Sequence, residues 1–286
     1  MNRRELLKGA AFGAIALAAS PRVLAMQARG AAARLAALEH RHGGRLGVAI
    51  LDTGSGVRIA WRGDERFLMC STFKLLLTAA VLKKVEDGTE KLDRRIVFGK
   101  DALLAYAPVT KQHVGPPGMT VAQLCEAAVT LSDNTAANLL LESIGGPAGL
   151  TRYARTLGDR FTLLDRMEPE LNPYDTTTPN AMLGDMQKLL LEEALSQSSR
   201  ERLTKWMLDC QTGLQSLRAG LPSGWRIGDK TGQWDDEKTG ANNDIAIIWP
   251  PGRKPLLVTA YYMTRTTDVA ARKAVLAQVG RIVATM

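Results

Sequence analysis

Cysteine, histidine and aromatic residues are scarce in this sequence. Its 286 residues include three cysteines, three histidines and only 5% aromatic side chains. Three cysteines are too few for a disulfide-stapled scaffold, and although the sequence is compatible with one disulfide, nothing in it selects the pair. No Cys/His context surrounds Cys70, so buried structural thiols are favoured over a nucleophilic cysteine. His40-Arg41-His42 is followed by no acidic residue and is interpreted as a cationic helix end, so no metal site is expected.

The sequence also lacks an apolar run long enough to cross a membrane as a helix. A basic stretch, Asn2–Lys8, precedes a short apolar run, Gly9–Ala19, and Val23-Leu24-Ala25 offers a small-residue cleavage site. Residues 1–25 are therefore predicted to be a signal peptide. Arg3-Arg4 followed by Leu-Leu-Lys resembles a twin-arginine export signal, with an ordinary secretory peptide as the alternative. The predicted location is periplasmic or secreted, with no stable membrane anchor, because no cysteine near the cleavage site could carry a lipid.

The charge balance argues against a nucleic-acid-binding protein. The chain has 37 basic and 29 acidic residues, which gives a net charge of +8. Loss of the predicted signal peptide removes four basic residues and one acidic residue and leaves about +5 on the mature chain. Hydrophobic residues make up 45% of the sequence, which excludes a disordered chain and favours one large domain with a packed core.

Predicted strands lie near both ends of the chain, and predicted helices lie between them. Alternation of apolar and polar residues predicts strands over Leu46–Leu51, Val57–Trp61, Trp225–Lys230, Ile245–Trp249 and Leu256–Met263. Helical spacing appears over Ala31–His40, over most of residues 71–211 and over Asp268–Ile282. We therefore expect an α+β protein with two lobes, in which an antiparallel sheet from both chain ends carries an inserted all-helical lobe.

The first candidate catalytic motif is Ser71-Thr72-Phe73-Lys74, at the start of the predicted helical part. Residues three apart share one face of a helix, so the Lys74 amine can reach the Ser71 hydroxyl. The helix dipole favours a negative charge that develops near the serine. A lysine acts as a base when burial or a neighbouring positive charge lowers its pKa. Alone, this motif is weak evidence, because Ser-x-x-Lys is frequent by chance.

Three further motifs follow along the chain. Ser132-Asp133-Asn134 begins the next helical stretch and can present a hydroxyl and an amide to a cleft. Glu168-Pro169-Glu170-Leu171-Asn172 is a proline-interrupted loop that carries a carboxylate and an amide. Lys230-Thr231-Gly232 ends a predicted strand, and its glycine would let a ligand approach the backbone closely. The four motifs together indicate a single catalytic site.

This set of motifs resembles that of the class A serine β-lactamases. The resemblance covers nearly all of the chain after the signal peptide, and it includes Met69-Cys70, Tyr106–Thr110 and Gly228-Asp229. It implies a two-lobed β-lactamase/transpeptidase-like fold in one domain over residues 26–286. The implied α/β lobe comprises residues 26–66 and 215–286, and the implied helical lobe comprises residues 67–214.

The resemblance implies catalytic roles for four residues. Ser71 would attack the β-lactam carbonyl and form an acyl-enzyme. Lys74, and Glu168 through a water, are alternative acceptors of its proton, and Ser132 would pass a proton to the departing ring nitrogen. Glu168, positioned with Asn172, would deprotonate the water that hydrolyses the acyl-enzyme.

The resemblance also implies how the substrate is held. Lys230 and Thr231 would bind the substrate carboxylate, and the charge of Lys230 would lower the pKa of Lys74. The backbone N–H groups of Ser71 and Gln233 would form the oxyanion hole. The implied substrate-binding residues are Tyr106, Asn134, Asn172, Lys230, Thr231, Gly232 and Gln233.

The predicted function is hydrolysis of the β-lactam amide bond, with small β-lactams as substrates and no cofactor, metal, nucleic acid or stable oligomer involved. One alternative is a penicillin-binding D-Ala-D-Ala acyltransferase that acts on peptidoglycan peptides. Glu168 argues against it, because the related transpeptidases lack the deacylating loop. A second alternative is a β-lactam sensor that stays acylated because deacylation is impaired.

Two segments depart from the family pattern. Arg166 and Asp175, expected to close the Glu168 loop as an ion pair, are separated by a segment roughly six residues shorter than usual. After Gly232, the longer segment Gln233–Asn242 is expected to form a loop, with the second Lys-Thr-Gly (residues 238–240) as a turn. One hypothesis is that Trp234 fills space beside Glu168, so that bulky oxyimino cephalosporins are admitted and penicillin turnover slows. Neutral length variation is the alternative. No supporting arginine for the substrate carboxylate can be placed.

Overall fold

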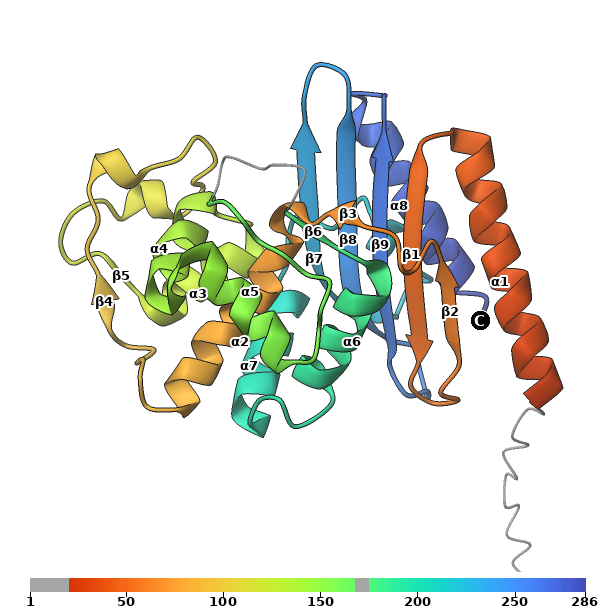
Figure 1. Cartoon of the computed structure of the whole chain (residues 1–286), viewed down its shortest axis with the longest axis horizontal. Helices are drawn as coiled ribbons and strands as arrows, with labels where there is room; N and C mark the ends of the chain where they lie inside the picture. Colours follow the sequence, from red (N-terminus) through yellow and green to blue (C-terminus); the bar gives the residue numbers. More distant parts are fainter. Residues whose placement is uncertain (1–20, 168–174) are drawn as a thin grey trace, which may run out of the picture.

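The computed structural model describes residues 21–167 and 175–286. A five-stranded antiparallel sheet lies beside a block of helices (Figure 1), which confirms the expected α+β fold with two lobes. Most of the predicted signal peptide lies outside the described residues. Its last five positions, 21–25, belong to the first helix, α1 (Pro21–His42), which is longer than expected at its N-terminal end. Among the described helices, none combines the length and apolarity needed to cross a membrane.

The sheet is assembled from both ends of the chain, as predicted. Its spatial order is β2-β1-β9-β8-β7, and all neighbouring pairs are antiparallel. The strands are β1 (Arg45–Asp52), β2 (Arg58–Trp61), β7 (Arg226–Asp235), β8 (Gly240–Trp249) and β9 (Leu256–Thr264). Strand β7 is therefore an edge strand, and it faces the block of helices at the point where the catalytic motifs meet.

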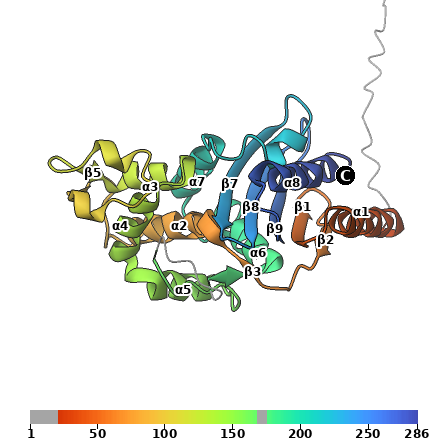
Figure 2. The same ribbon diagram turned by 90° about the horizontal axis from the view of Figure 1, so that it is seen from above.

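Alternate residues of the central strands face two separate cores. Val48 and Ile50 pack in a cluster with α1 and α8 (Val269–Val283), whereas Ala49 and Leu51 belong to the cluster under the helical block. Figure 2 shows α1 and α8 on the side of the sheet away from that block. The two-residue period of a strand thus gives the sheet two apolar faces, each covered by helices.

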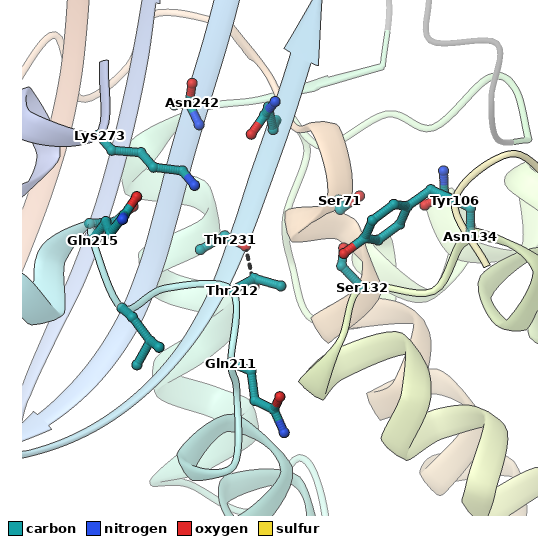
Figure 3. A pocket seen from close by; sticks show the side chains of 13 residues that line it. Ser71, Tyr106, Ser132, Asn134, Gln211, Thr212, Gln215, Thr231, Asn242 and Lys273 are labelled. Carbon is teal, nitrogen blue, oxygen red and sulfur yellow. Dashed lines mark hydrogen bonds between the residues drawn. The ribbon is translucent and has the colours of Figure 1, made fainter. Parts of the chain in front are cut away.

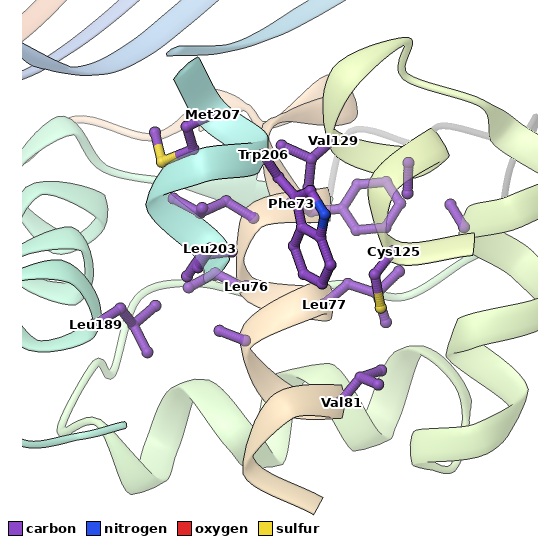
Figure 4. Packing of buried hydrophobic residues seen from close by; sticks show 14 of the residues in the cluster. Phe73, Leu76, Leu77, Val81, Cys125, Val129, Leu189, Leu203, Trp206 and Met207 are labelled. Atoms are coloured by element: carbon purple, nitrogen blue, oxygen red, sulfur yellow. The ribbon is translucent and has the colours of Figure 1, made fainter. Parts of the chain in front are cut away.

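The helical block is built around α2 (Phe73–Glu86), which carries Lys74. Residues 73–82 of this helix are all buried, Lys74 and Thr78 among them, so this part of α2 is enclosed on every side instead of on one face. Phe73, Leu76 and Leu77 pack against Trp206 and Leu203 of α7 (Figure 4). The surrounding helices are α3 (Val121–Thr130), α4 (Asn134–Ile144), α5 (Gly146–Thr156), α6 (Pro179–Leu190) and α7 (Gln197–Leu208). This packing holds the start of α2 rigidly beside the sheet.

Short elements complete the fold. Two-residue strands pair β3 (Phe67–Leu68) with β6 (Thr176–Thr177) and β4 (Arg95–Ile96) with β5 (Met119–Thr120). The 3-10 turns are η1 (Cys70–Thr72), η2 (Lys100–Ala102), η3 (Thr110–Gln112) and η4 (Leu217–Gly220). The three cysteines are buried thiols outside any disulfide, in agreement with their interpretation as structural residues.

The structure corrects one expectation for the sheet. The segment Gln233–Asn242 was expected to be a loop, but β7 continues to Asp235 and β8 starts at Gly240. The strands remain paired up to the positions of Asp235 and Gly240, so only residues 236–239 form the turn. Lys238 and Thr239 of the second Lys-Thr-Gly lie in this turn, as expected, whereas Gly240 is the first residue of β8. The extra residues therefore lengthen a hairpin, because their backbone groups continue the ladder of hydrogen bonds between the strands.

Candidate active site

Ser71 lies in η1, directly before α2, and its backbone is fixed from several sides. The preceding residue, Cys70, has a φ of 45°, in the left-handed region that non-glycine residues rarely adopt. Asn243 of β8 donates from Nδ2 to the carbonyl oxygens of Leu68, at 2.8 Å, and Met69, at 3.0 Å. Such strain persists where the surroundings over-determine the backbone, which is typical of functional sites.

Lys74 connects this segment to the next motif. It is fully buried, and its Nζ donates to the carbonyl oxygen of Ser132, at 2.9 Å, and to Oδ1 of Asn134, at 2.6 Å. Lys74 Nζ is the donor in both contacts, so the Asn134 oxygen faces it. Residues about 60 positions apart are thus held together by one buried amine.

Ser132 has the same kind of strained backbone as Cys70, with a φ of 59°. The next residue, Asp133, caps α4 by accepting from the Ala136 N–H at 2.9 Å. Its other carboxylate oxygen accepts from the backbone N–H groups of Val109 and Thr110, each at 2.9 Å. A carboxylate with several such donors is satisfied when buried, so Asp133 fixes both Ser132 and the segment that follows Tyr106.

Lys230 brings β7 to the serines. Its Nζ donates to Ser132 Oγ at 3.0 Å and to the Thr231 carbonyl oxygen at 2.7 Å. The Thr231 hydroxyl lies 2.5 Å from that of Thr212. Gly232 allows the close approach of β7, because a Cβ there would lie 2.9 Å from the Met69 carbonyl oxygen. The sequence-based interpretation assigned this glycine to ligand approach, whereas the neighbour that the structure reveals is the η1 backbone.

Two buried carboxyl groups and one arginine lie near Lys230. Asp229 accepts from Arg218 Nη2 at 2.8 Å, and Asp244 accepts from the Leu217 N–H at 3.0 Å. Burial raises the pKa of both carboxyl groups, and the charge of Asp229 raises that of Asp244 further. Both carboxyl groups lie near Arg218 and Lys230, whose charges act to lower these pKa values against the effect of burial.

A cavity of about 530 Å³ lies between the helical block and β7 (Figure 3). We call the side formed by Ser71, Tyr106, Ser132 and Asn134 the inner wall, and the opposite side formed by Gln233, Asn242 and Lys273 the outer wall. The cavity is lined by Ser71, Tyr106, Ser132, Asn134, Gln211, Thr212, Leu214, Gln215, Ser216, Thr231, Gln233, Asn242 and Lys273. Tyr106 is half exposed at the rim, and partial burial followed by the charge of Asp133 raises its pKa.

The structure brings most of the predicted site residues together. Ser71, Lys74 and Ser132 meet at the inner wall with Asn134 and Tyr106, and Lys230, Thr231, Gly232 and Gln233 lie along β7. Glu168 and Asn172 lie outside the described residues. The residues beside that segment are described: the Asp175 carboxylate accepts from the backbone N–H groups of Asp165, at 2.5 Å, and Arg166, at 3.3 Å.

Lys273 is a residue that the sequence reasoning missed. It lies on α8, is half-buried, and is the cationic side chain in the lining of the cavity given above. Within residues 21–167 and 175–286, no hydrogen bond or ion pair engages its ammonium. The sequence analysis places no arginine for the substrate carboxylate. Lys273 lies some 40 residues beyond Lys230 on a separate helix, so no sequence pattern connects it to the Lys230 motif.

Trp234 does not extend into a loop, in contrast to the expectation for its segment. It is partly buried on β7, where it packs against a small cluster of Leu68, Cys70 and Ala241. The hypothesis that Trp234 fills space beside Glu168 stays a prediction, because Glu168 lies outside the described residues. In the described residues there is also no group of three histidine, cysteine or acidic side chains that could hold a metal ion.

Comparisons with known proteins agree with this arrangement. A model of the Beta-lactamase enzyme family matches residues 30–285. The chain is 48% identical over 259 residues to Beta-lactamase L2 of Stenotrophomonas maltophilia, covering 88% of this chain and 84% of that protein. It is 45% identical over 298 residues to a β-lactamase of Streptomyces fradiae, covering 99% and 96%. An ancestral (GNCA) class A β-lactamase structure matches with a TM-score of 0.85 at 58% identity, covering 88% of this chain and 98% of that one.

Proposed function

The chain belongs to the class A serine β-lactamases, and from that premise we propose which of its residues carry out each step. The protein hydrolyses the amide bond of β-lactams through a serine acyl-enzyme and thereby confers β-lactam resistance. The acylated sensor and the D-Ala-D-Ala acyltransferase are not favoured.

Acylation begins with attack of Ser71 Oγ on the β-lactam carbonyl. The backbone N–H groups of Ser71 and Gln233 stabilise the oxyanion, because fixed dipoles need no reorganisation as the charge develops. Two observations support this role. The backbone before Ser71 is strained at Cys70 and is held by a hydrogen bond from Asn243, and Gly232 allows β7 to lie close to η1.

Proton transfer uses the chain of contacts between three motifs. Lys74 as its neutral amine, or Glu168 through a water, accepts the Ser71 proton. Ser132 gives its own proton to the departing nitrogen and regains one from the group that accepted the Ser71 proton. The contacts of Lys74 with the Ser132 carbonyl, at 2.9 Å, and of Lys230 with Ser132 Oγ, at 3.0 Å, support this proposal. They place the Ser132 hydroxyl beside a cation, which favours release of its proton.

Deacylation follows when Glu168, positioned with Asn172, deprotonates the hydrolytic water. The carboxyl end of their segment is fixed at Asp175, whose backbone oxygen accepts from the Met69 N–H at 2.9 Å. This contact connects the residue that follows their segment to the residue before η1, and it supports the proposal that deacylation takes place at Ser71.

Substrate binding uses both walls of the cavity. Asn134 and Tyr106 contact the acyl side chain from the inner wall. Thr231 and the positive field of Lys230 hold the substrate carboxylate, and Lys273 adds a cation at the outer wall. Lys230 is already bonded to Ser132, so a second cation increases the attraction for an anion.

The observation that carries the proposal is the meeting of Ser71, Lys74, Ser132 and Lys230, from three distant segments of the chain, beside one cavity. Benzylpenicillin hydrolysis by the wild type and by Ser71→Ala tests it. We expect the variant to lose at least about 10³-fold in kcat, as loss of a nucleophile does. Ser55→Ala, at an exposed turn, is the matched control and should keep wild-type turnover. Retained turnover in Ser71→Ala would refute the assignment.

We further propose that the protein is exported as a monomer by the twin-arginine route. The adjacent Arg3 and Arg4 before an apolar run support this route. Replacement of both by lysine should retain the enzyme in the cytoplasm, as measured by fractionation, and an unchanged periplasmic fraction would favour the ordinary secretory route. Light scattering of the mature chain tests the monomeric state.

A further inference from the structure

Arg272 is a fully buried arginine of α8 that binds the lengthened β7–β8 hairpin. Its Nε donates to Asn242 Oδ1 at 2.6 Å, its Nη1 donates to the Thr266 carbonyl oxygen at 2.7 Å, and its Nη2 forms an ion pair with Asp235. A buried guanidinium is costly unless its donors are satisfied, and here each nitrogen has an acceptor.

The hairpin is shaped to receive this side chain. Gly240 is paired with Asp235 across β7 and β8, and a Cβ at Gly240 would lie 1.7 Å from Arg272 Nη1. Any larger residue would occupy the position of the guanidinium. The absence of a side chain at Gly240 therefore creates the space that Arg272 fills.

The contacts of Arg272 determine how two amide groups of the outer wall are oriented. A guanidinium only donates, so the Asn242 oxygen must face Arg272, and the amide nitrogen takes the other position. Asn242 lines the cavity beside Lys273 (Figure 3). The second oxygen of the Asp235 carboxylate accepts from Gln233 Nε2 at 3.1 Å, so Gln233 is connected to the same cation.

We propose that Arg272 is a positioning residue for β-lactam binding, which holds the Asn242 amide with its N–H₂ group available to the bound substrate beside Lys273. The proposal rests on the assignment of the cavity as the β-lactam site. Arg272 itself does not line the cavity, and it acts through Asn242 and Asp235. Because the amide is oriented before the substrate arrives, binding does not have to order it, and this lowers KM.

The variant Asn242→Asp separates binding from folding. Its carboxylate still accepts from Arg272, so the hairpin stays attached to α8, but the N–H₂ donor is lost and a negative charge faces the substrate. We expect KM for benzylpenicillin to rise roughly tenfold or more, with kcat changed by less than about threefold and Tm no lower than in the wild type. An unchanged KM would overturn the proposal, because a purely structural Asn242 predicts that result.

A double-mutant cycle tests whether Arg272 acts through Asn242. Arg272→Lys keeps the charge but cannot hold three separated acceptors, and we expect it to raise KM several-fold in the wild-type background. In the Asn242→Ala background the same change should have little further effect on KM. Additive effects in the two backgrounds would overturn the positioning role, whatever the change in Tm.

Two further measurements keep the test decisive. If Arg272→Lys does not fold, Asp235→Asn weakens the same network from the exposed side and enters the cycle in its place. Lys238→Ala, at the exposed turn of the same hairpin, is the control and should leave KM unchanged. Absence of benzylpenicillin turnover by the wild type would refute the assigned function, whereas wild-type turnover with unaltered KM in the variants would refute only this inference.

Discussion

The inner and outer walls of the cavity are built in different ways. The inner wall consists of short sequence motifs whose polar groups bond to one another, as Lys74 does to Ser132 and Asn134. The outer wall combines residues of β7, β8 and α8. The orientation of its Asn242 amide depends on Arg272, which lies outside the cavity. The comparison suggests that chemistry is determined by the inner wall and that substrate affinity is adjusted at the outer wall.

The largest expected effect comes from removing Lys230, the cation that donates to Ser132 of the inner wall. Lys230→Ala eliminates the donor to Ser132 Oγ and the positive field that attracts the substrate carboxylate, and we expect kcat/KM for benzylpenicillin to fall by roughly 10²–10⁴. Lys205→Ala, at an exposed lysine of α7, is the control. A loss below about tenfold in a folded Lys230→Ala protein would place proton delivery elsewhere.

A smaller but still large effect is expected from Gly232→Ala. The added methyl group would lie 2.9 Å from both Cys70 Cβ and the Met69 carbonyl oxygen, so β7 must move away from η1. Displacement of catalytic groups by about 1 Å can cost roughly 100-fold, and we expect a decrease in kcat of that order. Gly30→Ala has open space around it and should change nothing. Equal activity in the two variants would contradict the role given to this contact.

Substitutions in the outer wall should raise KM and leave kcat nearly unchanged. Lys273→Met removes the cation of the outer wall, and we expect roughly a tenfold increase in KM for benzylpenicillin with kcat nearly unchanged. Lys273→Arg should restore KM, and the dependence of kcat/KM on ionic strength should weaken in the methionine variant. Should kcat fall and KM stay constant, the division of labour between the two walls would be wrong.

The smallest expected effect on activity belongs to a carboxyl group far from both walls. Asp185 of α6 is buried, and burial followed by the charge of Asp159 raises its pKa to about 9. In the unfolded chain the same group ionises at its ordinary acidic pKa, so between these values folding takes up a proton and stability falls as pH rises. Asp185→Asn removes this dependence.

We expect Asp185→Asn to raise Tm by roughly 3–8 °C at pH 7 and to have much less effect at pH 4, where the unfolded chain already holds much of the proton that folding takes up at pH 7. Thermal melts monitored by circular dichroism measure this difference. Asp93→Asn, at an exposed turn, should match the wild type at both pH values. A Tm difference that does not depend on pH would show that Asp185 is ionised when folded.

The two walls also differ in how far they could be predicted. Ser71 and Lys74 share a helical face, and Ser132 lies just before α4, so short motifs taken together, with the family resemblance that they carry, identified the inner wall. The Lys230 motif was expected to end a strand, but it lies within β7. Lys273 and Asn242 belong to no recognisable motif, because they reach the cavity only through the packing of α8 on the sheet. No residue near them in sequence reveals that packing.

The hairpin was predicted wrongly for a related reason. Asp235, Asp236 and Glu237 are typical turn residues, so the sequence favours a loop after Gly232. In the structure, Asp235 remains in β7 because Arg272 provides an opposite charge from another element. A long-range ion pair thus overrides the local preference, and single-sequence patterns do not contain that information.

Mass spectrometry of the intact mature protein during incubation with benzylpenicillin tests the central claim most directly. The account predicts a transient or undetected adduct on Ser71 while hydrolysed penicillin accumulates, and no adduct in Ser71→Ala. A stable adduct on Ser71 without turnover would contradict it, because the protein would then be acylated but unable to deacylate.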